Sequence, residues 1–162
     1  MNLLTMTITF GLAACVLLVV WLFLLGRTNP RIMLQDYPRD VQAAVPPKTA
    51  QERRQTVYWA IPLFLLFLAF PVAAALTAKT AGADVLTIAL CAFGVGVVIN
   101  LFDLLILDWL MFCTWTPQFV VLPGTEEMAG YKDYGLHFRG FLTGIVISAA
   151  LSAIIAGIVY VI

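Results

Sequence analysis

Three polar residues lie within an apolar stretch, and their types and positions could support chemistry inside a membrane. Asn100 lies near the middle of the stretch Val85–Cys113, with Asp103 about 6 Å and Asp108 about 13 Å from its centre if the stretch is helical. An aspartate near the middle of a bilayer costs about 2.5–3.5 kcal/mol to insert. We therefore expect Asp103 to face protein or a water-filled cavity, either protonated or hydrogen-bonded to Asn100 or to a serine of the last apolar stretch, and Asp108 to reach the interface.

The spacing of the two aspartates argues against a shared site on one helix. At about 100° per residue, Gly96, Asn100, Asp103 and Leu107 fall in one stripe. Asp108 is five residues beyond Asp103, so on an α-helix it points about 140° away. A prenyltransferase-like magnesium site is therefore disfavoured, and we expect no metal site.

A second group of candidates precedes and begins the last apolar stretch. Its members are aromatic or ionisable and are expected at the membrane interface: Tyr131, Asp133, Tyr134, His137 and Arg139. We expect Arg139 to form an ion pair with Asp108, because both enter the membrane at about the same depth. The sequence lacks the motifs HExxH, GxSxG, CxxCH and the Walker loop, so we expect no cofactor.

Four apolar stretches must position these residues. Hydrophobic residues make up 62% of the 162 residues and charged residues 11%, which excludes an ordinary soluble domain. The stretches cover about residues 3–25, 57–77, 85–113 and 138–162, and each is long enough to cross roughly 30 Å of hydrocarbon. We predict an all-α integral membrane bundle of four transmembrane helices, forming one domain with loops at residues 26–56 and 114–137. Nine basic residues balance nine acidic ones, so nothing indicates a nucleic-acid partner.

Basic residues predict the orientation in the membrane. The two loops, with Arg139 just beyond the second, carry eight Lys and Arg residues, whereas the connection between the second and third stretches carries only Lys79. The positive-inside rule predicts that both loops are cytoplasmic and that both termini lie outside. Tryptophans near the loop ends of the stretches agree with this.

Small residues recur every four positions along the last stretch: Gly140, Gly144, Ser148, Ser152 and Ala156. Such a row lets two helix backbones approach closely. It predicts packing either against the third stretch of the same chain or against a second copy.

The loops contain local patterns that resemble a known kind of protein. Asp36-Tyr37-Pro38, Val45-Pro46-Pro47, the run from Val121 to Glu126, the run from Tyr131 to Gly135 and His137-Phe138 resemble small four-span bacterial membrane proteins. The resemblance implies a bacterial cytoplasmic membrane and brings no activity or functional residues with it.

Three classes of function remain open from the sequence. The first is a non-enzymatic accessory or assembly subunit that acts by helix packing and loop contacts, with a membrane-protein partner in the bilayer. The second is a homo-oligomeric carrier or channel that uses Asn100 and Asp103. The third is a membrane enzyme with an interfacial site near Asp108, His137 and Arg139.

Overall fold

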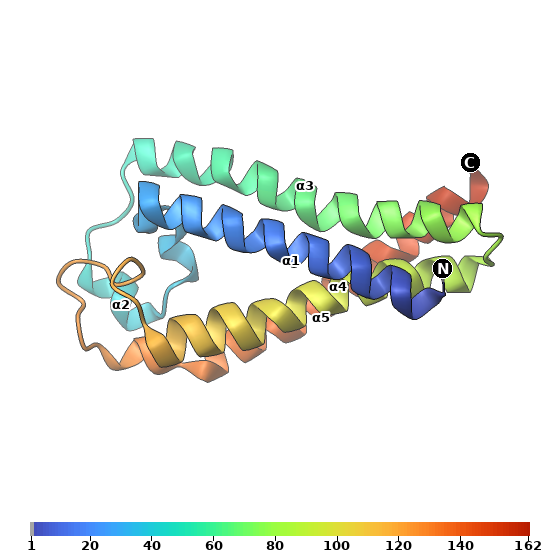
Figure 1. Ribbon diagram of the computed structural model, residues 1–162. Coiled ribbons are helices and arrows are strands. Elements are labelled where there is room, and N and C mark those ends of the chain that lie inside the picture. The colour runs from blue at the N-terminus through green and yellow to red at the C-terminus, as the bar shows by residue number, and fades with distance from the viewer. Residues whose placement is uncertain (1) are drawn as a thin grey trace.

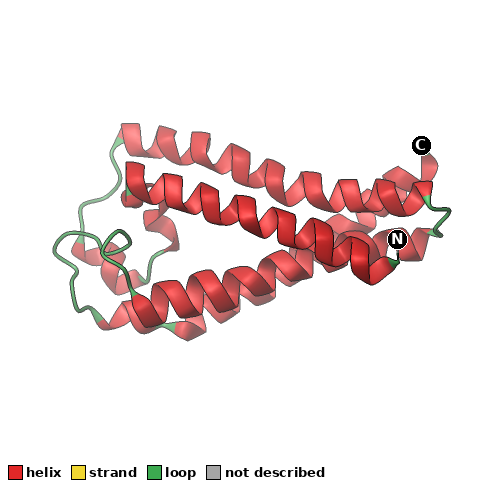
Figure 2. Cartoon of the chain, in the orientation of Figure 1, coloured by secondary structure: helices red, strands yellow, loops and turns green. Residues whose placement is uncertain are grey.

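The structure is a computed structural model that describes residues 2–162, and four long helical segments form its bundle (Figures 1 and 2). They are α1 (Leu3–Thr28), α3 (Ala50–Thr80), α4 (Val85–Phe102) with its continuation η2 (Asp103–Trp115), and α5 (Tyr134–Val161). Each is long and apolar enough to cross a membrane. The prediction of an all-α bundle of four such helices is confirmed.

Three short helices belong to the loops. η1 (Pro30–Asp36) and α2 (Arg39–Ala44) lie between α1 and α3, and η3 (Ala129–Lys132) precedes α5. Both loops gather at one end of the bundle, and both termini lie at the other end with the turn between α3 and α4 (Figure 1). We call these the loop end and the terminal end.

The outer surface of the bundle is apolar. Val16 on α1, Phe64 on α3 and Val146 on α5 are 63%, 66% and 68% exposed. A soluble protein rarely exposes apolar surface of this extent, whereas lipid covers it at no cost.

Local sequence signals set the ends of several helices. Thr49 accepts a hydrogen bond from the backbone N–H of Glu52, and the Glu52 carboxylate accepts from the N–H of Thr49. This capping box starts α3 at Ala50, ahead of the apolar stretch expected from residue 57. Pro62 and Pro71 lie within α3 without ending it, because a helix in a membrane tolerates proline where neighbouring groups satisfy the freed carbonyl.

The small residues of α5 pack against α4 of the same chain. The amide of Asn100 donates to the backbone oxygen of Gly96 at 2.8 Å and to Oγ of Ser148 at 3.1 Å. A Cβ added at Gly144 would collide with the Asn100 side chain, and one added at Gly96 would lie 2.8 Å from Oγ of Ser148. The two helices therefore approach as closely as these small residues allow.

The two loops fold together over the loop end. Buried residues from both form a small core that is separate from the membrane bundle: Leu34, Tyr37, Val41, Leu122 and Tyr131. The Tyr37 hydroxyl donates to the backbone oxygen of Val120 at 2.8 Å, and the Tyr131 hydroxyl accepts from the N–H of Leu122 at 3.0 Å. The two loops thus form one ordered cap over the loop end of the bundle.

Candidate functional site

A cavity of about 800 Å³ lies inside the loop half of the bundle. Its walls come from α1, α3, the α4–η2 helix and α5, and η1 and α2 contribute to its lining at the loop end. A volume of this size is in the range of small-molecule binding sites.

The cavity is apolar on one side and polar on the other. Leu18 and Leu22 on α1 and Leu63 and Phe67 on α3 supply apolar surface. Acidic and basic side chains come from η1, α2, η2 and α5, and these are Asp36, Arg39, Asp103, Asp108 and His137. The polar side therefore carries three carboxyl groups, one guanidinium and one imidazole.

The helix carrying Asp103 and Asp108 is not α-helical there, and this corrects the expectation that they face different directions. From Asp103 to Trp115 the chain forms a π-helix of 13 residues. Its hydrogen bonds join residues five apart, as in the 2.8 Å bond from the N–H of Thr116 to the oxygen of Met111. Asp103 and Asp108, also five apart, therefore come onto one side of the helix, and both line the cavity.

Asp108 pairs with His137, and the predicted ion pair with Arg139 is wrong. Oδ1 of Asp108 lies 3.0 Å from Nδ1 of His137. Arg139 is exposed and makes no ion pair within the described part of the chain. It follows His137 by two residues on α5, and because two residues turn an α-helix by about 200°, the two side chains leave the helix on opposite sides.

Asp103 lines the cavity but does not share the hydrogen bonds expected for it. Asn100 bonds to Gly96 and Ser148, as described above, and no bond joins Asp103 to Asn100 or to a serine of α5 in residues 2–162. Asp103 is instead one of the residues that line the cavity. Asn100 therefore helps to pack α4 against α5. Asp103, the next of the predicted intramembrane polar residues, makes no such hydrogen bond within residues 2–162.

His137 has one buried nitrogen without a hydrogen-bond partner in the described part of the chain. Its imidazole packs against Phe112, with ring centroids 5.1 Å apart, and its side chain is 11% exposed. Nε2 is buried and has no hydrogen-bond partner within residues 2–162. A buried polar atom without a partner costs about 1–3 kcal/mol, so this atom is a point where an added group would stabilise the protein.

The other predicted interfacial residues have structural roles outside the cavity. Tyr131 belongs to the loop core, and Asp133 caps α5 by accepting from the N–H of Leu136 at 2.9 Å. The hydroxyl of Tyr134 lies 2.9 Å from Oγ1 of Thr114, and its ring packs against Trp109. These contacts hold the first turn of α5 in position and therefore determine where His137 lies.

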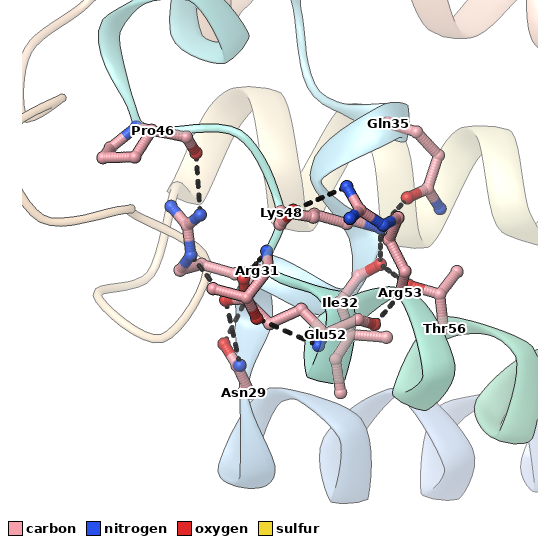
Figure 3. A network of polar contacts seen from close by, with 10 residues as sticks. Asn29, Arg31, Ile32, Gln35, Pro46, Lys48, Glu52, Arg53 and Thr56 are labelled. Carbon is pink, nitrogen blue, oxygen red and sulfur yellow. Dashed lines mark hydrogen bonds and ion pairs between the residues drawn. The ribbon is translucent and has the colours of Figure 1, made fainter.

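A network of polar contacts fastens η1 to the start of α3 (Figure 3). Glu52 accepts from Nε of Arg31 at 2.7 Å, and Arg31 also donates to the backbone oxygen of Pro46 at 2.8 Å. The ammonium of Lys48 bonds to Ile32, Gln35 and Thr56. The network holds the segment that carries Asp36 against the bundle.

Asp36 and Arg39 line the cavity although neither is among the candidates expected from the sequence. Asp36 lies in the first loop, where nothing in the sequence links it to the third helix. Partial enclosure by protein raises the pKa of its carboxyl, and the hydrogen bond from Gln35 and the nearby Lys48 oppose that rise. Asp36 is nevertheless exposed, so the polar side of the cavity reaches solvent at the loop end.

No group of three or more histidine, cysteine, aspartate or glutamate side chains in residues 2–162 is arranged to hold a metal ion. Comparison with protein families, with curated proteins and with solved structures found no match to this chain.

Proposed function

We propose that this protein binds a small amphipathic cation in the cavity of its membrane bundle. The observation that carries the proposal is a cavity of about 800 Å³ with three carboxylates on its polar side and aliphatic and aromatic side chains on the other. A cation attached to an apolar chain matches both sides. Inside the bundle, where protein and lipid give a low dielectric constant, an ionised carboxylate attracts the cation more strongly than it would in water.

A carrier must bind its substrate. Here a single chain lines the whole cavity, so binding does not require the homo-oligomer on which the carrier hypothesis depended. The accessory-subunit hypothesis is less well supported, because it drew on the small-residue row of α5. Gly144 and Ser148 of that row pack against α4 of the same chain. We therefore favour ligand binding over assembly.

The proposed setting is a bacterial cytoplasmic membrane with the loop end in the cytoplasm. The support is the excess of basic residues in the loops and the resemblance described above. In this orientation the polar side of the cavity opens towards the cytoplasm.

The proposal is tested with two ligands that have the same chain and opposite charge, octyltrimethylammonium and octyl sulfonate. The full-length protein is placed in phosphatidylcholine nanodiscs, and binding is followed by tryptophan fluorescence, since Trp21 and Trp59 line the cavity. Empty nanodiscs correct for partition into lipid. We expect saturable binding of the cation at least about tenfold tighter than that of the sulfonate.

Asp103→Asn should weaken binding of the cation by about tenfold, because it removes one carboxylate from the cavity. Glu127→Gln is the matched control, since it removes the same charge from an exposed loop residue outside this cavity. Equal affinities for the two ligands, or equal effects of the two variants, would overturn the proposal.

A further inference from the structure

The Asp108–His137 pair determines which nitrogen of the imidazole carries hydrogen. A carboxylate only accepts, so Nδ1 of His137 must donate to Oδ1 of Asp108. In the neutral imidazole the other nitrogen, Nε2, is then a hydrogen-bond acceptor. Asp108 thus sets Nε2 as an acceptor.

This acceptor is unpaired within the described chain and is covered by protein atoms, so a ligand in the cavity reaches it only when the imidazole or its neighbours shift. His137 lines the cavity, and Nε2 lacks a donor although it is enclosed by protein. The ionisable groups on the elements around it are Asp103 and Asp108 on η2, Asp36 on η1 and Arg39 on α2. Arg39 is the one permanent donor among them, and it makes no hydrogen bond to His137.

A ligand that suits both the acidic residues and Nε2 of His137 therefore carries a positive charge and a hydrogen-bond donor. Three carboxylates favour a cation, and the unpaired acceptor favours a cation that carries N–H groups. A quaternary ammonium satisfies the first requirement and fails the second, because it has no N–H. A primary ammonium satisfies both.

We propose that the ligand is a primary amine on an apolar chain, bound as the ammonium ion with one N–H donating to Nε2 of His137. The inference rests on the proposed function and narrows its ligand class. The remaining N–H groups face the carboxylates of Asp103 and Asp36, and the chain lies along Leu22, Leu63 and Phe67. Asp108 is a positioning residue, because it acts through the imidazole.

Two sources could supply this chemistry, a small lipophilic amine or the ethanolamine headgroup of a phospholipid. Both present a primary ammonium next to an apolar chain. Phosphatidylcholine presents a quaternary ammonium, so it is a suitable background lipid that lacks the proposed donor.

The test compares octylamine, as its ammonium ion, with octyltrimethylammonium on the full-length protein in phosphatidylcholine nanodiscs. We expect octylamine to bind at least about tenfold tighter, because only the primary ammonium can donate a hydrogen bond to Nε2 of His137. His137→Phe keeps a ring against Phe112 and removes the acceptor. In that variant the preference for octylamine should disappear while octyltrimethylammonium still binds, which also shows that the variant is folded.

The outcomes separate this inference from the proposed function. If both cations bind equally to the unaltered protein, the ammonium inference is overturned and cation binding stands. If neither binds saturably, both fail. If His137→Phe keeps the preference for octylamine, Nε2 is not the acceptor and the inference is overturned.

A last arm identifies the source of the ammonium. Replacing part of the phosphatidylcholine by phosphatidylethanolamine should weaken the apparent affinity for octylamine if the headgroup occupies the site. An unchanged affinity, together with the preference for octylamine, supports a small lipophilic amine.

Discussion

Asp108 on η2 and His137 on α5 meet across the helix seam, with Oδ1 of the carboxylate 3.0 Å from Nδ1 of the imidazole. The contact joins the π-helical segment to the start of the last helix. It depends on η2, since an α-helix through the same residues would turn Asp108 away from Asp103 by about 140°. The π-helix therefore places Asp103 and Asp108 on the same cavity as His137.

Asp108→Leu should lower the free energy of unfolding by about 1–3 kcal/mol, because it leaves the buried N–H of His137 without an acceptor. Asp108→Asn should cost less, since the amide oxygen still accepts. Unfolding in mixed detergent micelles measures both. In the background of His137→Phe the two substitutions should have nearly equal effects; a persistent difference would mean that Asp108 acts through another group.

Gly144→Ala should destabilise the α4–α5 contact by about 1–3 kcal/mol, because the added Cβ collides with the Asn100 side chain that bonds to Ser148. Gly157→Ala is the control on the same helix. Nothing lies within 4 Å of a Cβ added there, so it should be neutral or stabilise by up to about 1 kcal/mol. The same unfolding assay applies, and similar effects of the two variants would show that α5 does not pack on α4 as described.

Glu52→Gln should loosen η1, which lines the cavity at the loop end. It removes the ion pair with Arg31, whose Nε lies 2.7 Å from Oε1 of Glu52. We expect faster amide hydrogen exchange in residues 30–36 and a loss of about 1–3 kcal/mol of stability. Glu127→Gln, on the exposed second loop, should leave exchange in residues 30–36 unchanged.

Alkaline pH should destabilise the loop cap through Tyr37. Burial raises the pKa of its phenol above the ordinary value, and the nearby Tyr131 adds to the rise. The unfolded chain ionises a tyrosine near pH 10, so above this pH the folded state holds the proton that the unfolded state releases. The free energy of unfolding should therefore fall as the pH rises past about 10.

Tyr37→Phe removes this ionisable group and should flatten that fall, even though losing the bond to Val120 lowers stability at every pH. Tyr160→Phe, at an exposed residue of α5, should keep the slope of the unaltered protein. Denaturation curves across the alkaline range measure the slopes. Identical slopes for Tyr37→Phe and the unaltered protein would contradict the prediction.

Cysteine labelling in intact cells tests the orientation. The three native cysteines are buried, so an introduced thiol is the accessible one in the folded protein. Ala81→Cys, in the exposed turn between α3 and α4, should react with an impermeant reagent from outside. Glu126→Cys, in the exposed second loop, should react only after permeabilisation; the reverse pattern would invert the proposed topology.

The sequence by itself determined the four helices. Apolar runs of sufficient length require helices in a membrane, because every backbone polar group must be satisfied within the segment. The start of α3 was also predictable, since the capping box of Thr49 and Glu52 is local in the chain. The small residues of α5 likewise predicted close packing, with α4 of the same chain as one of two alternatives.

The candidate site was decided only by the tertiary structure. The π-helix from Asp103 to Trp115 has no pattern in the sequence that marks it, and an α-helical extrapolation placed Asp108 on the wrong side. Asp36 reaches the cavity because two loops, distant in sequence, fold together around Tyr37 and Tyr131. Helix formation depends on near neighbours along the chain, whereas the site depends on contacts between segments up to about a hundred residues apart, and these exist only once the bundle is packed.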